Sequence, residues 1–287
     1  MIKYLLLLCL STILLAQESI HSSASTYYEN KTFKNSVQKE DGYVYGVGAD
    51  IHYNNSAFKI AYEYGYTTTK QPPLQEDLNT KKIFFKYAYQ FDRKFSLNVN
   101  YIGILEDNIA ETDGGVTFGG GGTYTFTKNI SLNFTEFYTD YKYFDVFQSD
   151  LRIDYKTRLN KVKIKLSSIT KYISLYENND QREVLRFITN TQDNYLTSGF
   201  KFHIHYASYH LGGGAFFGKR AFAIMDDGFK TQHHAMEFDK TYAIGLGKNI
   251  YDFVLRAQYI YQRAEELPMK NKDVEVDNIR IIANYRF

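Results

Sequence analysis

Lysine side chains recur at every second position in the stretch KVKIKL, where Lys161, Lys163 and Lys165 alternate with apolar residues. Successive side chains of a β-strand point to opposite faces, so these three lysines are expected to share one face. Other basic residues fall on the corresponding face of further segments, namely Arg152, Lys156, Lys201, Arg256 and Arg280. Cations gathered around water attract anions. The alternative is that acidic loop residues fold inward and pair with them: Glu106, Asp107, Glu111 and Asp113.

Three histidines are grouped in the stretch HIHYASYH. If Ala207 and Ser208 form a two-residue turn, His205 lies opposite His210, and His203 lies two residues along on the same face. Three imidazoles could form a weak transition-metal site or a pH-sensitive constriction. Because nothing in the sequence supplies a fixed second shell, we interpret them first as solvated histidines.

A second histidine pair, His233–His234, lies in a polar stretch near Asp226 and Asp227, and we expect it to be solvated surface. Ser208 between two histidines is the nearest approach to a nucleophile and base, but the supporting geometry is missing. The sequence therefore predicts no catalytic residues, no enzyme and no cofactor.

The segments that position these side chains are runs of alternating polar and apolar residues. The chain has 27 tyrosines, 22 phenylalanines and only 3 prolines, a composition that favours β-strands. About thirteen such segments follow residue 42, and a weaker one lies at 24–33. Together they predict about fourteen strands, an even number as in bacterial single-chain barrels, with twelve or sixteen as alternatives.

Short and long connections alternate along the chain. Short ones such as NNS, DRK and TKN separate longer polar ones at 68–80, 106–114, 141–146, 176–193, 219–235 and 262–276. This rhythm predicts an all-β fold: a closed antiparallel up-and-down transmembrane β-barrel with tight turns at one end. The apolar faces are dense in Tyr and Phe and would face lipid, whereas a water-soluble β-protein would present a polar outside.

Two charged residues contradict this alternation. Lys240 falls on the apolar face of MEFDKTYAIGLG, and Glu136 falls on that of ISLNFTEFYTD. A basic residue facing the bilayer centre costs about 2–4 kcal/mol and an acidic one less. Either a β-bulge reverses the register there, or the residues lie at the membrane rim, or the strands are wrongly assigned.

The beginning of the chain predicts export. Residues 1–16 have the pattern of a secretory signal peptide, with Lys3 before an apolar run that ends near Ala16. Cys9, the only cysteine, lies inside this segment, so the exported chain would have no disulfide. Residues 17–41 are expected to form either the first strand or a plug, and residues 42–287 the transmembrane barrel.

The closing stretch NIRIIANYRF resembles the C-terminal signature of Gram-negative outer-membrane β-barrel proteins. Apolar residues recur at every second position from Ile279 to Tyr285 and Phe287. In that family the last strand ends on Phe and is read by the barrel-assembly machinery, so the resemblance implies that Tyr285 and Phe287 form an assembly signal. The chain as a whole resembles a porin-like barrel, and no motif links it to one porin family.

The resemblance implies a location in the cell outer membrane and passive diffusion of small hydrophilic solutes, and the basic face would add a modest anion preference. The expected partners are outer-membrane lipid, the assembly machinery and small solutes. A formal net charge of only +2 argues against nucleic acid. Two alternatives remain: a transporter of hydrophobic compounds with an N-terminal plug, and a surface adhesin-type barrel with a closed lumen.

Overall fold

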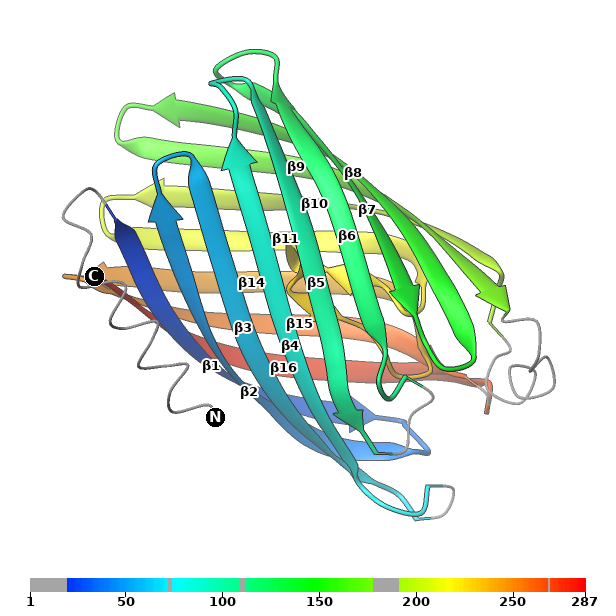
Figure 1. Ribbon diagram of the computed structural model, residues 1–287. Coiled ribbons are helices and arrows are strands. Elements are labelled where there is room, and N and C mark those ends of the chain that lie inside the picture. Colours follow the sequence, from blue (N-terminus) through cyan, green and yellow to red (C-terminus); the bar gives the residue numbers. More distant parts are fainter. Residues whose placement is uncertain (1–19, 72–73, 109–111, 178–190, 268) are drawn as a thin grey trace, which may run out of the picture.

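The computed structural model describes residues 20–71, 74–108, 112–177, 191–267 and 269–287. In these residues fourteen antiparallel strands form a closed barrel, and β1 pairs with β16 to complete the wall (Figure 1). The wall strands are β1 (His21–Lys34), β2 (Lys39–Tyr53), β3 (Ser56–Thr69), β4 (Leu78–Gln90), β5 (Phe95–Asp107), β6 (Val116–Thr125), β7 (Ile130–Asp140), β8 (Phe144–Leu159), β9 (Val162–Glu177), β10 (Asn194–Tyr206), β11 (Tyr209–Arg220), β14 (Met236–Ile250), β15 (Phe253–Glu266) and β16 (Asn271–Arg286). The all-β, up-and-down barrel predicted from the sequence is confirmed.

The N-terminal part of the described chain belongs to the wall. Residues 21–34 form β1, which pairs with β2 on one side and with β16 on the other. The predicted signal peptide, residues 1–16, lies outside the described residues. Among the described residues no helix is long and apolar enough to cross a membrane.

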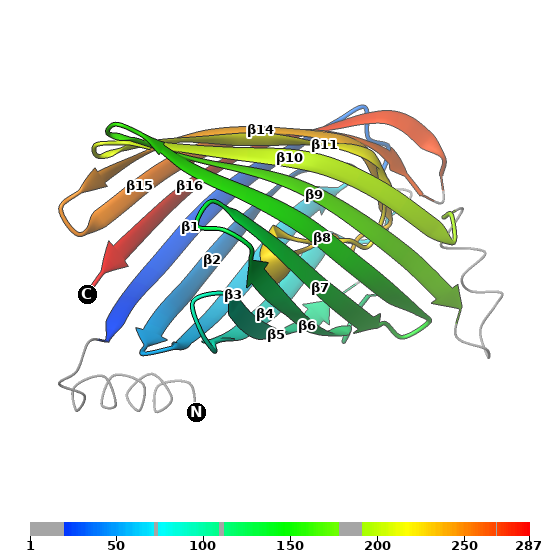
Figure 2. The same cartoon turned by 90° about the horizontal axis from the view of Figure 1, so that it is seen from above.

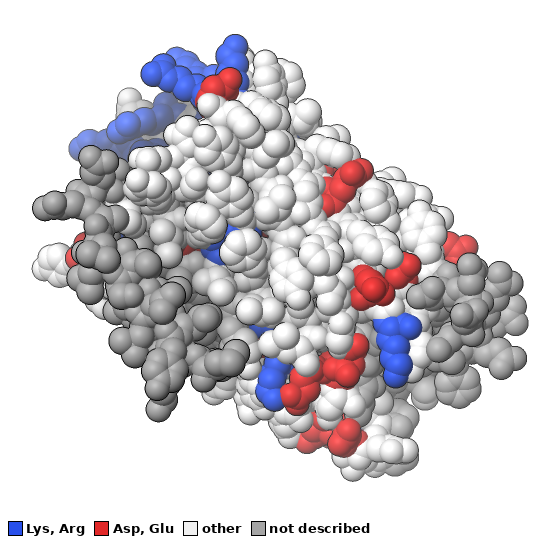
Figure 3. Space-filling model, viewed as in Figure 1, with Lys and Arg blue, Asp and Glu red and all other residues white. Residues whose placement is uncertain are grey.

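The outside of the barrel is apolar. Alternate residues of each strand expose large hydrophobic side chains, such as Val47 at 55%, Phe118 at 61% and Leu246 at 66% of their surface. Figure 3 shows a broad white area across the visible face, with Lys and Arg gathered mainly at the upper left, at the short-turn end of the barrel. Such an exterior is stable in lipid, and closure leaves no strand edge unpaired there.

Tyrosine and phenylalanine form an aromatic girdle at the short-turn end, in a chain without tryptophan. Phe91 contacts Tyr89 and Phe95, with ring centroids 4.9 and 5.6 Å apart. Tyr285 contacts Phe253 at 4.8 Å and Phe287 at 4.9 Å. Aromatic residues concentrate where the bilayer meets water, so this end of the barrel lies at a membrane interface.

Short turns, such as residues 54–55, 160–161 and 207–208, join strands at the end of the barrel where β1 begins and β16 ends (Figure 1). Long connections lie at the other end, which corresponds to the outside of the cell in barrels of this type. The predicted long loop at 262–276 is wrong, because β15 continues to Glu266 and β16 begins at Asn271. The polar residues of this segment alternate with the buried Val274 and Val276, so the segment continues the β15–β16 pairing and does not form a loop.

The two charged misfits have different explanations. The register shifts between Phe238 and Lys240, and this bulge turns Met236 and Phe238 to the inside while Lys240 stays on the outer face. At Glu136 the register is continuous, and the carboxylate is exposed on the outer face of β7 opposite Gly120. Glu136 therefore faces the lipid without a charged partner among the described residues.

Glu136 offers a stability test of the membrane position. Glu136→Leu should raise the free energy of unfolding by about 1 kcal/mol, because a lipid-facing charge on a barrel strand is destabilising. The measurement is urea unfolding of the barrel in lipid vesicles. Asp140→Leu, at the end of the same strand, is the control and should change stability by less than about half as much. A less stable Glu136→Leu barrel would mean that the carboxylate has a partner and does not face lipid.

Candidate functional site

Residues 221–235, between β11 and β14, fold into the barrel and are called the inward hairpin. They form the short strands β12 (Ile224–Met225) and β13 (Lys230–Thr231), joined by the single turn η1 (Asp226–Gly228). Figures 1 and 2 show this yellow segment inside the barrel, surrounded by wall strands. The sequence predicted a polar external loop here, and that prediction is wrong.

An apolar patch on the inner wall holds one side of the hairpin. Phe222 packs edge-on against Phe144, with ring centroids 4.7 Å apart, within a cluster that also includes Ile104, Val146 and Ile173. Ile224 packs in a second cluster, which is formed with Phe84, Ile102 and Phe137. Burying side chains of this size stabilises by about 1.5–3 kcal/mol each. The hairpin is therefore held by burial of apolar surface inside the barrel.

Polar side chains of the wall satisfy the backbone of the hairpin. The Gln148 side-chain amide donates to the Ile224 carbonyl and accepts from the Ile224 amide, both at 2.8 Å. Lys171 Nζ donates to the same carbonyl at 2.9 Å. Buried backbone groups need such partners, so β8 and β9 replace the pairing that a further strand would provide.

The tip of the hairpin is acidic and meets basic wall residues. Lys201 Nζ donates to Asp226 at 2.9 Å, and Arg152 forms an ion pair with Asp227. Lys86 Nζ donates to the Asp227 carbonyl at 3.1 Å. The positive charge of Lys201 holds the pKa of Asp226 well below its usual value. Burial alone would raise the pKa of Asp227, but Arg152 and Lys86 lower it below its usual value.

On the opposite side the hairpin contacts β1. Lys230 Nζ lies 3.6 Å from the carboxylate of Glu29, which is 1% exposed. Arg280 donates to Glu29 at 2.6 Å, and Lys31 lies 3.8 Å away. Three cations thus surround one carboxylate where the hairpin passes β1 and β16.

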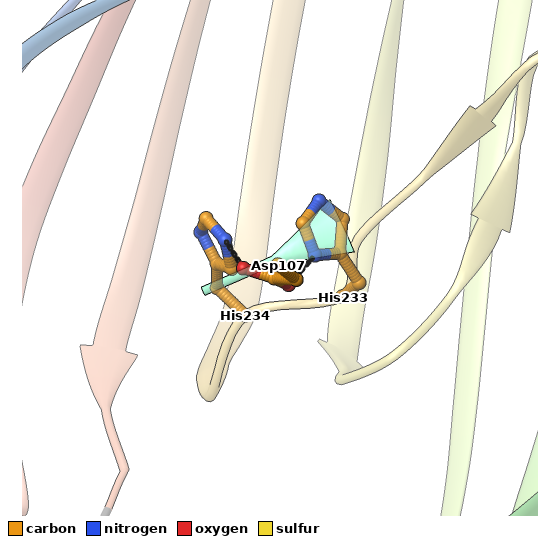
Figure 4. A group of neighbouring side chains, drawn as sticks. All are labelled: Asp107, His233 and His234. Carbon is orange, nitrogen blue, oxygen red and sulfur yellow. Dashed lines mark hydrogen bonds and ion pairs between the residues drawn. The ribbon is translucent and has the colours of Figure 1, made fainter. Parts of the chain in front are cut away.

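The end of the hairpin is also fixed, and His233–His234 are not solvated surface as the sequence suggested. Asp107, on β5, lies between the two rings (Figure 4). His233 Nδ1 donates to Asp107 Oδ2 at 2.8 Å, and the side chain of His233 is only 6% exposed. Burial lowers the pKa of His233 below its usual value and that of His234 to about 3.

Three cavities adjoin along one side of the hairpin. A vestibule of about 710 Å³ at the short-turn end and a central cavity of about 390 Å³ share Lys165 and His203 in their linings. The central cavity shares Lys230, Gln232, Gln262 and Arg280 with an outer gap of about 90 Å³. The volume of the space beside the hairpin therefore decreases from the short-turn end towards the long-loop end.

The predicted wall residues are distributed over this space. Lys156 and Lys163 line the vestibule, and Lys165 does so while pairing with Asp154 at 3.2 Å. Arg152 and Lys201 hold the hairpin tip, and Arg280 holds Glu29. Lys161 lies in the β8–β9 turn, and Arg256 is exposed on the inner face of β15. The acidic groups that meet this wall are Asp154 on β8 and Asp226 and Asp227 on the hairpin. Of the predicted loop residues, Glu106 pairs with Lys81, Asp107 pairs with His233, and Glu111 lies outside the described residues.

The histidines of HIHYASYH come together near the short-turn end. His205 pairs with His210 across the turn, as the two-residue turn predicts, and their rings stack with centroids 4.3 Å apart. His203 Nε2 lies 3.3 Å from His210 Nδ1. His210 Nε2 contacts Asn249 Oδ1 at 2.8 Å. No carboxylate belongs to this cluster among the described residues.

Sequence reasoning missed the inward hairpin, although two signals were present. The run AFAIM, residues 221–225, is too apolar for a loop in water. A second signal lies in the wall, where inward positions near the long-loop end are apolar, including Ile102, Ile104 and Val146. Taken alone, each signal could be a local departure from the usual polarity of a loop or of a barrel interior. Taken together, they predict that a loop segment packs inside the barrel.

A disulfide tests the docking of the hairpin. A Cβ at position 228 would lie 3.6 Å from the Cβ of Asn100, within the roughly 3.5–4.5 Å that a disulfide requires. In a Cys9→Ser chain, Gly228→Cys with Asn100→Cys should cross-link on oxidation, although the positive φ at 228 adds about 1–2 kcal/mol of strain.

The measurement is mobility on a non-reducing gel after unfolding. Gly228→Cys with His205→Cys, whose second position lies at the short-turn end, is the control and should stay uncross-linked. Failure of the first pair to cross-link in a folded barrel would show that the hairpin does not dock against β5.

Comparison with known proteins places this geometry in a known architecture. No family model and no curated protein match the sequence. A bacterial polysaccharide outer membrane secretin is similar over 95% of this chain and 99% of its own, with a TM-score of 0.54 and 8% identity. The Acinetobacter baumannii outer membrane protein Omp33 is similar over 93% and 99%, with a TM-score of 0.51 and 9% identity. Pseudomonas aeruginosa OccK8 (OprE) is similar over 93% and 97%, with a TM-score of 0.43 and 12% identity.

Likeness at such low identity concerns the fold alone. The closed barrel, its lipid-facing exterior and its aromatic girdle agree with that likeness. The chain has the closed-barrel fold of outer-membrane β-barrel proteins, and its apolar exterior and aromatic girdle are those of a membrane-spanning barrel.

Proposed function

We propose that this protein is a porin-like channel through which small hydrophilic solutes diffuse passively, with a modest preference for anions. The observation that carries the proposal is the series of three adjoining cavities beside the inward hairpin, which share polar and basic lining residues. The path runs along β9, β10, β16 and β1, and the hairpin sets its width.

The preference for anions rests on the vestibule. Among the described residues that line it, five are Lys or Arg, two are His and none is acidic. Asp154 faces Lys165, but Lys128, Lys156 and Lys163 have no carboxylate within ion-pair distance among the described residues. Unneutralised cations around water raise the local concentration of anions.

Solute size is limited by the hairpin. The outer gap of about 90 Å³ is the smallest of the three adjoining spaces, and charged side chains of Glu29, Lys82 and Arg280 line it. A narrow, charged opening favours small hydrophilic solutes over large or apolar ones.

We also propose contacts of the barrel exterior with lipid and of the last strand with the assembly machinery. Outer-membrane lipid would contact the exposed aromatic and aliphatic side chains of the wall. Phe287 is 73% exposed and Tyr285 packs against it, which leaves both accessible to an assembly factor before the barrel closes. We propose them as the assembly signal.

A closed lumen is the second candidate. It is favoured by the small outer gap and by the many contacts that hold the hairpin across the interior. In that case the barrel would act through its external loops, as an adhesin-type protein. An N-terminal plug has no support in the described residues, since residues 21–34 form β1.

Conductance in a planar bilayer under a salt gradient separates these candidates. The channel reading predicts stable open steps and a reversal potential that favours anions. Lys156→Gln with Lys163→Gln should shift that potential towards cations, because two unpaired charges leave the vestibule.

The control is Lys248→Gln. This lysine lies on the outer face of β14, over the ring of Tyr209, so it removes the same charge outside the lumen. Its reversal potential should equal that of the unaltered protein. Open steps without a shift in the double variant would reject the anion-selective vestibule, and absence of steps from a folded, inserted barrel would favour the closed lumen.

A further inference from the structure

Asp107, His233 and His234 form a compact cluster that the channel does not require. One ligand-type atom of each residue lies within 4.8 Å of those of the other two. Asp107 comes from the end of β5, and the histidines come from the end of the inward hairpin, so the cluster joins a wall strand to a segment that crosses the lumen (Figure 4).

Two atoms of the cluster face each other without a hydrogen-bond partner. Asp107 Oδ1 and His234 Nε2 are both buried and both unsatisfied, and they lie 3.5 Å apart. The side chain of Asp107 is fully buried. A buried carboxylate oxygen without a partner is costly, and so is a buried ring nitrogen, so a group that contacts both would stabilise this arrangement.

We propose that Asp107, His233 and His234 bind a divalent transition-metal ion such as Zn²⁺, which fastens the inward hairpin to β5. Two imidazoles and one carboxylate are a ligand set that zinc commonly takes, with a water molecule as a fourth ligand.

The distances fit an ion after small movements. Ligand atoms about 2.0–2.2 Å from one zinc ion in tetrahedral geometry lie roughly 3.3–3.6 Å from one another. The separation of Asp107 Oδ1 from His234 Nε2, 3.5 Å, already falls in this range. His233 Nδ1 lies 2.8 Å from the other carboxylate oxygen, Oδ2, and the three ligand atoms lie within 4.8 Å of one another, so the imidazoles must shift for all three to reach one ion.

The side chains around His233 determine which of its ring nitrogens can bind the ion. Lys82 Nζ lies 3.3 Å from His233 Nε2 and also pairs with Glu63. When the metal replaces the proton on His233 Nδ1, Nε2 becomes the donor and Lys82 must turn fully to Glu63. Glu63 balances the charge of Lys82, and Lys31, Lys230 and Arg280 on the lining of the same gap share the carboxylate of Glu29.

Entry to the cluster is open from the outer gap. Both histidines line this gap, together with Lys82 and Glu63. Thr112 Oγ1 lies 2.9 Å from Asp107 Oδ2 and 3.0 Å from the His233 carbonyl oxygen, so its one proton is shared between these acceptors and the hydroxyl orients two of the ligands. Supporting contacts of this kind are what distinguishes a metal site from histidines that are merely close together.

The experiment is a Zn²⁺ titration by calorimetry on the refolded full-length barrel with Cys9→Ser, after treatment with a chelator. His203, His205 and His210, called the mouth histidines, are the other candidate ligands, so the same titration is made with His203→Gln and His205→Gln. The expected result is one Zn²⁺ per chain in both proteins. His234→Gln should weaken binding by more than the roughly 10–100-fold that loss of an outer-shell partner costs.

A second readout does not depend on the calorimetry. Zn²⁺ should raise the Tm of the unaltered barrel and leave that of His234→Gln unchanged, because an ion that binds only the folded state stabilises it. Asp107→Asn should behave like His234→Gln. If Asp107→Asn does not fold, the test still rests on His234→Gln, because the side chain of His234 is partly exposed and its replacement disturbs the fold less. Equal affinity in His234→Gln, or binding lost only with the mouth histidines, would overturn the proposal.

Discussion

Lipid offers no hydrogen-bond partners, so every backbone amide and carbonyl within the bilayer must pair inside the protein. The ladder between β1 and β16, from Ser23 opposite Arg286 to Lys34 opposite Glu275, meets this requirement by closing the wall. A closed wall of fourteen strands encloses more space than its own side chains fill, since eight strands already suffice for a filled barrel. The interior must therefore hold water, a folded segment, or both.

The inward hairpin divides that interior into two unlike halves. At the long-loop end the wall is apolar, and Phe222 and Ile224 are buried against it. At the short-turn end the wall carries unneutralised lysines around a vestibule. Ion pairs from Asp226 to Lys201 and from Asp227 to Arg152 mark the boundary between them. A single segment thus determines both the width of the path and how much of the basic wall remains free to attract solutes.

The sequence was sufficient for features that depend on local alternation. The strand count, the lipid-facing side of residues such as Ile281 and the pairing of His205 with His210 follow from period two and from turn length. The sequence was insufficient for features that depend on contacts between residues far apart in the chain. Nothing near His233 in the chain indicates Asp107, and the bulge before Lys240 turns Met236 and Phe238 inward without a proline or glycine to mark it. The hairpin escaped prediction for the same reason, because its partners are spread over distant strands, from Glu29 on β1 to Lys201 on β10.

The most direct test of the account is the single-channel conductance of a barrel in which residues 222–232 are replaced by a short Gly–Ser linker. The account predicts a conductance several-fold higher than that of the unaltered protein, because the hairpin narrows the path, and a preference for anions that persists, because the vestibule is unchanged. A folded, inserted variant with unaltered conductance would contradict it, since the narrowest part of the path would then lie elsewhere.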